Sequence, residues 1–308
     1  MLRPSIAAAT LAACLGAMAQ TQPPPPSLPE SLTMRAAQRL QAGDMPGALA
    51  DVTAAILRDS RSSGAYALRG TIRMTTGDRP GALLDFTRSI ELTPEVKGIE
   101  IVYVNRANLH WLDGKHRDAA VDIERALKLN PNFALAYNVR GRLKADAMDL
   151  DGARADFDRA ILLEPKMMPA YVARAAVNLQ AGRLQEAIGD YKTLMWSLPN
   201  DADMVASHGI VRGMLGETGQ GVDDLLKART MNPRSVSDEP RGPQSSPAQR
   251  LDQYIEMNPN EGRTLAMRAA VSFLNNEGER GRKELARAVQ LDPALRADAE
   301  TIRARLAR

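Results

Sequence analysis

The chain has 308 residues, of which 44% are hydrophobic, so it is long enough to form a sizeable core. Its formal net charge of +3 comes from 40 basic and 37 acidic residues, and no basic stripe is interleaved with aromatics, which argues against a nucleic-acid partner. Only 4% of the residues are aromatic, and there are three His and one Cys, whereas a globular enzyme of this size usually has more of each.

Residues 1–19 have the pattern of a secretory signal peptide. Arg3 supplies a short positive region, residues 6–18 are apolar and rich in Ala, and Ala17-Met18-Ala19 is an A-x-A cleavage site. An apolar stretch of this length is too short to span a bilayer, so we expect the segment to be removed. Residues 20–28 form a Pro-rich spacer that favours stiff polyproline II. We therefore expect the folded part to be periplasmic or secreted.

A second interpretation of this segment stays open. Residues 11–14 (Leu-Ala-Ala-Cys) resemble the lipobox of bacterial lipoproteins, in which cleavage after Ala13 leaves Cys14 lipidated at the new N-terminus. The chain would then be an outer-membrane lipoprotein that assists envelope or pilus assembly, with Cys14 as its membrane anchor. Against this, the apolar stretch before Cys14 is short and residues 15–19 stay apolar. Cleavage after Ala19 leaves a mature chain that has no Cys and needs no disulfide in an oxidising compartment.

From residue 29 onward the sequence repeats with a period of about 34 residues. Each unit predicts two helices: the first carries a small residue, and the second carries apolar residues at relative positions 0, +4 and +7, which share one helix face. A Gly between the helices suits a helix C-cap, and a Pro stops the second helix. These prolines are 37, 34, 34, 34, 26 and 34 residues apart, at Pro94, Pro131, Pro165, Pro199, Pro233, Pro259 and Pro293.

This pattern resembles the tetratricopeptide-repeat family, and the resemblance implies an all-α, right-handed superhelical solenoid of helix-turn-helix repeats. In this register residues 29–235 form six repeats, with an insertion near residues 96–98. Residues 236–247 are a loop rich in turn formers that replaces a first helix. Residues 248–308 then hold a broken repeat with only its second helix, one full repeat at 262–295 and a C-terminal capping helix. The gap is a candidate contact point, and a degenerate repeat with a surface loop is the simpler alternative.

Two columns of opposite charge follow the same period. Arg recurs just before the small residue, and an acid recurs just before a large apolar residue of the second helix. A row of arginines alone would suggest a polyanion site. Because the acidic column runs beside it at fixed spacing, we predict a partly buried ladder of Arg–carboxylate pairs within the repeats. The basic column is Arg35, Arg69, Arg106, Arg140, Arg174 and Arg268, with His208 breaking the series, and the acidic column is Asp51, Asp85, Asp122, Asp156, Asp190, Asp224 and Glu284.

Known catalytic and metal-binding motifs are absent from the sequence, so we predict no enzyme activity, no cofactor and no metal site. The three His residues lack metal-ligand spacing. The Gly-rich stretch from Gly216 to Gly221 falls on a turn between helices and follows no strand, which argues against a phosphate loop. The acids between Asp149 and Asp158 are spaced like part of a calcium loop, but Ala147 stands where the first ligand would be.

The resemblance also implies a function. First helices of tetratricopeptide repeats line a concave face on which family members bind extended or helical peptide segments. Asn can donate to and accept from a peptide backbone, and Trp111 offers a flat apolar surface with one donor. We therefore expect a scaffold that binds a protein or peptide partner of unknown identity. A clamp for acidic chain termini is not implied, because only Asn138 and Arg142 fit its pattern. The inward-facing positions are Thr71, Met74, Asn105, Asn108, Trp111, Asn138, Arg142, Asp146 and Gln180.

Overall fold

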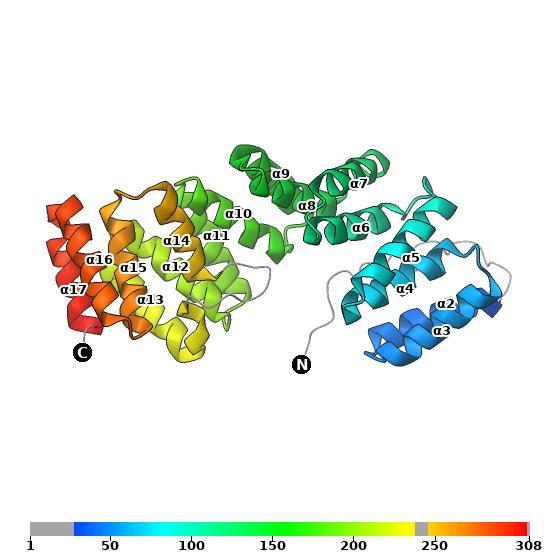
Figure 1. Cartoon of the computed structure of the whole chain (residues 1–308), viewed down its shortest axis with the longest axis horizontal. Coiled ribbons are helices and arrows are strands. Elements are labelled where there is room, and N and C mark those ends of the chain that lie inside the picture. The colour runs from blue at the N-terminus through cyan, green and yellow to red at the C-terminus, as the bar shows by residue number, and fades with distance from the viewer. Residues whose placement is uncertain (1–27, 238–245, 307–308) are drawn as a thin grey trace. The chain divides into compact units, whose positions relative to one another are not determined.

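The computed structural model describes residues 28–237 and 246–306, which form 16 α-helices, two short 3-10 helices and no strand (Figure 1). The predicted signal peptide, Cys14, nearly all of the spacer and residues 238–245 of the predicted loop lie outside the described residues. Six helical hairpins come first: α2 (Leu28–Gln41) with α3 (Met45–Arg58), α4 (Ser63–Thr76) with α5 (Arg79–Leu92), α6 (Glu100–Leu112) with α7 (His116–Leu129), α8 (Ala134–Asp146) with α9 (Leu150–Leu163), α10 (Met168–Gln180) with α11 (Leu184–Ser197), and α12 (Ala202–Met214) with α13 (Thr218–Met231).

After the six hairpins come a single helix, a seventh hairpin and a last helix. A 3-10 turn, η1 (Pro233–Val236), follows α13, and α14 (Pro247–Met257) is a single helix without a hairpin partner of its own. A seventh hairpin consists of α15 (Gly262–Leu274) and α16 (Gly278–Leu291). The last elements are η2 (Pro293–Leu295) and α17 (Arg296–Leu306), which packs against α13 and α15.

Local sequence signals set the hairpin turns. Helix α4 ends at Gly77, whose φ of 88° is the left-handed conformation that Gly adopts most easily. The next residue, Asp78, caps α5 by accepting a hydrogen bond from the backbone N–H of Gly81 at 2.9 Å. Asp149 caps α9 in the same way through Gly152. The carboxylate that resembled a calcium ligand in the sequence is therefore a helix cap.

The chain divides into two compact units, one ending at Leu143 and the other beginning at Lys144. The small residues of the first helices let each hairpin close tightly: a Cβ on Gly70 would lie 2.7 Å from the ring of Phe86. The apolar columns predicted from the sequence form the cores of both units, with Val52, Phe86 and Ile123 completely buried in the first and Phe157, Tyr191 and Leu225 in the second. The predicted all-α architecture of helix-turn-helix units is confirmed.

Candidate functional site

Each hairpin is cross-linked by a carboxylate of its second helix, which accepts hydrogen bonds from its first helix. Asp85 is 3% exposed and accepts from Nε and Nη2 of Arg69 at 2.9 and 2.7 Å. His208 takes the Arg position in α12, and its Nδ1 lies 2.9 Å from Oδ2 of Asp224. The predicted ladder is confirmed for four two-bond Arg–Asp pairs: Arg35–Asp51, Arg69–Asp85, Arg106–Asp122 and Arg174–Asp190.

A second column of donors, which we did not predict from the sequence, lies four residues further along each first helix. Arg73 donates to Asp85 at 2.8 Å, and Nζ of Lys144 lies 2.8 Å from Asp156. Asp85 is thus approached from two positions of the same helix. The column repeats with the same period, but its residue types differ from one repeat to the next: Arg39, Arg73, His110, Lys144, Asn178, Arg212 and Ser272.

Several arginines also reach the second helix of the preceding hairpin. Arg140 donates to Glu124 at 3.0 Å, and Arg174 bonds to Asp158 as well as to its own Asp190. Arg268 also reaches outside its own hairpin, since it donates to Asp252 of α14 at 2.6 and 3.3 Å. The sequence register could not show this, since an acid stands sixteen residues away on both sides.

Hydrogen bonding and burial act in opposite directions on the pKa values of these groups. The bond from Arg35 lowers the pKa of Asp51, and the same contact raises the pKa of Arg35. At Asp190, burial raises the pKa against the opposing effect of the Arg174 bond. Burial alone would lower the pKa of Arg174, but its bonds to two carboxylates outweigh that effect and raise it. The guanidinium groups therefore stay charged, and the four two-bond Arg–Asp pairs are ion pairs.

The predicted groove residues of the first unit lie on α4, α6 and α8. Thr71 is completely buried and its hydroxyl donates to the carbonyl of Ala67 at 3.0 Å, so this hydrogen is not available to a ligand. Met74 packs against the core of the unit. Asn105 and Asn138 are 1% and 5% exposed, and each leaves a buried amide atom without a partner: Nδ2, a donor, in Asn105 and Oδ1, an acceptor, in Asn138.

The clearest contact among the predicted groove residues joins two neighbouring first helices. The guanidinium carbon of Arg142, on α8, lies 3.9 Å from the centre of the Trp111 ring, on α6. This cation–π pair makes a flat surface with a positive charge on one face. Asn108 is half-buried one turn before Trp111 on the same helix. The other two predicted residues, Asp146 and Gln180, belong to the second unit, where Nε2 of Gln180 donates to Sδ of Met148 at 3.4 Å.

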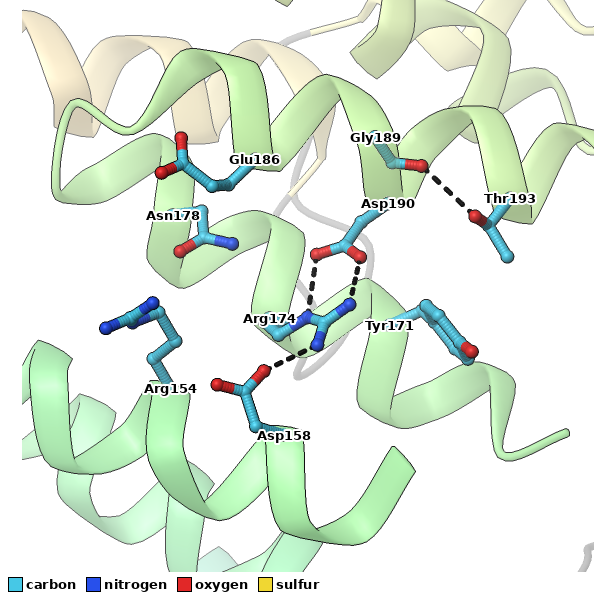
Figure 2. A pocket seen from close by; sticks show the side chains of 9 residues that line it. All are labelled: Arg154, Asp158, Tyr171, Arg174, Asn178, Glu186, Gly189, Asp190 and Thr193. Carbon is cyan, nitrogen blue, oxygen red and sulfur yellow. Dashed lines mark hydrogen bonds and ion pairs between the residues drawn. The ribbon is translucent and has the colours of Figure 1, made fainter. Parts of the chain in front are cut away.

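The second unit has a polar cavity of about 410 Å³ between α9, α10 and α11, which our sequence reading missed. Figure 2 shows Arg174 at its base, bonded to Asp158 on one side and to Asp190 on the other. Nε of Arg154 and Oδ1 of Asn178 are buried without a partner. The lining holds two guanidinium groups and three carboxylates, since Glu186 also faces it (Figure 2), and it has no pairing of a nucleophile with a base. The arrangement can bind polar groups.

Two further surveys concern chemistry and membranes. Within residues 28–237 and 246–306, no group of three or more His, Cys, Asp or Glu side chains is arranged to hold a metal ion. No helix in that same part of the chain combines the length and the apolar character needed to cross a bilayer.

Comparison with known proteins places this geometry. The sequence model of the tetratricopeptide repeat matches residues 101–133, the hairpin of α6 and α7. A tetratricopeptide-repeat protein from Parabacteroides merdae is similar at 20% identity and a TM-score of 0.55, over 89% of this chain and 98% of that one. The fold is a tetratricopeptide-repeat solenoid. The Cut9–Hcn1 hetero-tetramer of the APC/C is similar over 90% of this chain and 49% of that one, at 14% identity and a TM-score of 0.56.

The family model covers one repeat of the chain, and at such low identities the structural likenesses show the fold alone. Comparison with curated protein sequences gave no significant match. The positions of the Arg–Asp ladder fall on the repeat's hairpins, so in this chain they hold the solenoid together.

Proposed function

We propose that this chain is an exported scaffold that holds a segment of a partner protein against α4, α6 and α8 of its first unit. The observation that carries the proposal is the Trp111–Arg142 pair, which joins neighbouring first helices at 3.9 Å. Asn108, half-buried one turn before Trp111 on α6, adds an amide that can donate to and accept from a peptide backbone.

The chemistry of the surface indicates what kind of segment it would hold. Trp111 supplies apolar area, and Arg142 supplies a cation already held in place, so the pair favours a segment with an aromatic or apolar side chain next to a carboxylate or a backbone carbonyl. The buried ladder carboxylates are already satisfied by the arginines of their own hairpins. We assign this surface to binding and propose no catalytic step.

A crosslinking pull-down from the cell envelope tests this proposal. The triple variant Asn108→Ala, Trp111→Ala, Arg142→Ala should lose a partner that the unchanged chain retains, with equal helix content by circular dichroism. Recovery of the same partners with both chains would place binding elsewhere and refute the site.

A matched control removes apolar surface from the second helices of the same unit. Leu57, Leu84 and Val121 are 83%, 71% and 68% exposed on α3, α5 and α7. Replacing all three by Ala should leave the partner bound. If both triple variants lost the partner equally, the partner would be binding to exposed apolar surface in general and not to a specific site.

Export is the second part of the proposal, and it rests on the A-x-A pattern that ends at Ala19. Intact-mass analysis of the protein from cells should show a mature chain that begins at Gln20. A heavier, lipid-modified chain that begins at Cys14 would support the alternative, an outer-membrane lipoprotein that assists envelope or pilus assembly. A chain that keeps residues 1–19 in the cytoplasm would refute both.

A further inference from the structure

The seventh hairpin stacks directly on the sixth, although the chain makes a long excursion between them. Helix α15 contacts both α12 and α13, just as α4 contacts both α2 and α3. The hairpin of α15 and α16 thus takes the place of the next repeat. The described elements between the two hairpins, η1 and α14, therefore lie outside the regular stack. Helix α14 does not pair with a preceding first helix to form a hairpin.

Helix α14 lies instead across first helices. Besides η1, its main contacts are with α10, α12 and α15, the first helices of three hairpins. The face that it buries is apolar: Ala248 and Leu251 are completely buried and Tyr254 is 5% exposed, with its hydroxyl close to Gly182 at the end of α10. With the cover of α14 and of their other neighbours, all but two of the 13 residues of α12 and all but one of the 13 residues of α15 are buried. In α4 of the first unit, only six of 14 are.

The ends of α14 are defined by the segment itself. Oγ of Ser246 accepts from the N–H of Gln249 at 3.2 Å, and Oε1 of Gln249 accepts from the N–H of Ser246 at 2.8 Å, which is a complete capping box. At the other end, Nδ2 of Asn258 donates to the carbonyl of Tyr254. The helix has 11 residues, and isolated helices of fewer than about 12 residues are marginal in water. Segment 246–258 therefore has the properties of a helical ligand that folds on its docking surface.

One ion pair gives this docking a chemical preference. Arg268 of α15 is 1% exposed, and its guanidinium donates to both carboxylate oxygens of Asp252, at 2.6 and 3.3 Å. A buried guanidinium favours a helix that brings a carboxylate to this point, because a helix without one would remove both of these charge-assisted hydrogen bonds. Asp252 directly follows Leu251, the centre of the apolar face of α14.

We propose that the surface formed by the first helices α10, α12 and α15 is a binding site for an amphipathic helix, and that α14 occupies this site in the resting chain. Its external partner is a helix of another protein with the pattern of α14: apolar residues at the positions of Ala248, Leu251 and Tyr254, and a carboxylate after the central one. Because α14 is tethered, it competes at an effective concentration of about millimolar order, so the partner binds fully only when α14 is displaced. This surface is distinct from the Trp111–Arg142 surface of the first unit.

The test uses the full chain and a fluorescent peptide with the sequence of residues 246–258. The variant Leu251→Asp places a charge in the buried face and should undock α14. It should bind the peptide at least tenfold more tightly than the unchanged chain does, by fluorescence anisotropy. The matched control Gln253→Asp adds the same charge to the exposed face of α14 and should bind no better than the unchanged chain. A peptide with Asp252→Asn should bind the Leu251→Asp chain at least tenfold more weakly than the original peptide.

Two results would overturn the proposal. One is a Leu251→Asp chain that keeps its helix content but binds the peptide no better than the control. The other is a Leu251→Asp chain that loses the helices α12 and α15, which would make α14 part of the core rather than an exchangeable ligand.

Hydrogen exchange on the unchanged chain gives a measurement that needs no variant. The amides of α14 should exchange at least a hundredfold faster than those of α12 and α15, through an opening that leaves those helices intact. Exchange of all three helices at one common rate would refute an independent opening of α14.

Discussion

Asp85 offers the sharpest test of the ladder, because three charge-assisted hydrogen bonds converge on it. Two come from Arg69 at 2.9 and 2.7 Å and one from Arg73 at 2.8 Å, and the Asp85 side chain is only 4% exposed. The substitution Asp85→Ala leaves both cations together, with the Arg69 side chain 15% exposed. Removing one partner of a buried pair costs about 3–5 kcal/mol, because the other charge stays behind uncompensated. That is a large part of the roughly 5–15 kcal/mol by which a domain is stable.

Two comparison variants separate the ion pair from its surroundings. The double variant Arg69→Met, Asp85→Leu removes the charge pair together and should cost much less than Asp85→Ala, since apolar residues of similar volume often replace a buried pair at little cost. Glu91 forms a pair with Arg88 in the same helix, but both side chains are about half exposed. Glu91→Ala should therefore change the stability by less than about 1 kcal/mol.

Urea unfolding followed by circular dichroism measures these free energies, and hydrogen exchange of α4 and α5 localises the loss to one hairpin. The reasoning fails if Asp85→Ala costs no more than Glu91→Ala. It also fails if Arg140→Ala leaves the fold intact and abolishes binding of the partner, because the arginines would then serve a ligand.

Two further predictions use other features of the same unit. The pKa of Asp51 is lowered in the folded state, chiefly by the bond from Arg35. The ionised Asp51 carboxylate should therefore stabilise the fold fully above its unfolded pKa of about 3.9, and this stabilisation should disappear as the pH falls through the lower folded pKa. The variant Asp51→Asn should accordingly show a smaller change in melting temperature between pH 7 and pH 2. Gly70→Ala should destabilise by about 1–3 kcal/mol, since its methyl group would meet Phe86, whereas Gly64→Ala in the same helix meets nothing within 4 Å and should be neutral or stabilising in the same urea titration.

The period of the sequence predicted most of the fold because the forces that make a hairpin are local. Gly77 at a turn, Phe86 in the core and the pair of Arg69 with Asp85 all lie within one repeat, so their spacing reveals them. The second donor column was missed although it has the same spacing. Arg39, His110 and Ser272 look unrelated in a sequence, and only the geometry shows that each reaches the carboxylate of its own hairpin.

The candidate sites were harder to predict because they depend on what packs against each first helix. Counting inward positions selected Thr71, whose hydroxyl the backbone of its own helix already satisfies. The same counting found Trp111 and Arg142, which do meet. The break in the period marked residues 234–257 as irregular, but the docking of α14 on α10 joins residues some 70 positions apart, and a pattern with a 34-residue period carries no information at that range.

The Arg column explains how the solenoid accommodates α14. Arg140 and Arg174 each bond to an acid on the second helix of the preceding hairpin, so the column ties neighbouring repeats as well as the two helices of one repeat. Arg268 makes the same kind of bond to Asp252, although α14 has turned its apolar face onto first helices. Helix α14 thus accepts the same kind of Arg bond as a second helix of a regular repeat, but it packs against first helices and not within a hairpin. Displacement of α14 therefore removes the two bonds of Asp252 from Arg268 of the seventh hairpin, so a partner helix that supplies a carboxylate at the same point restores them.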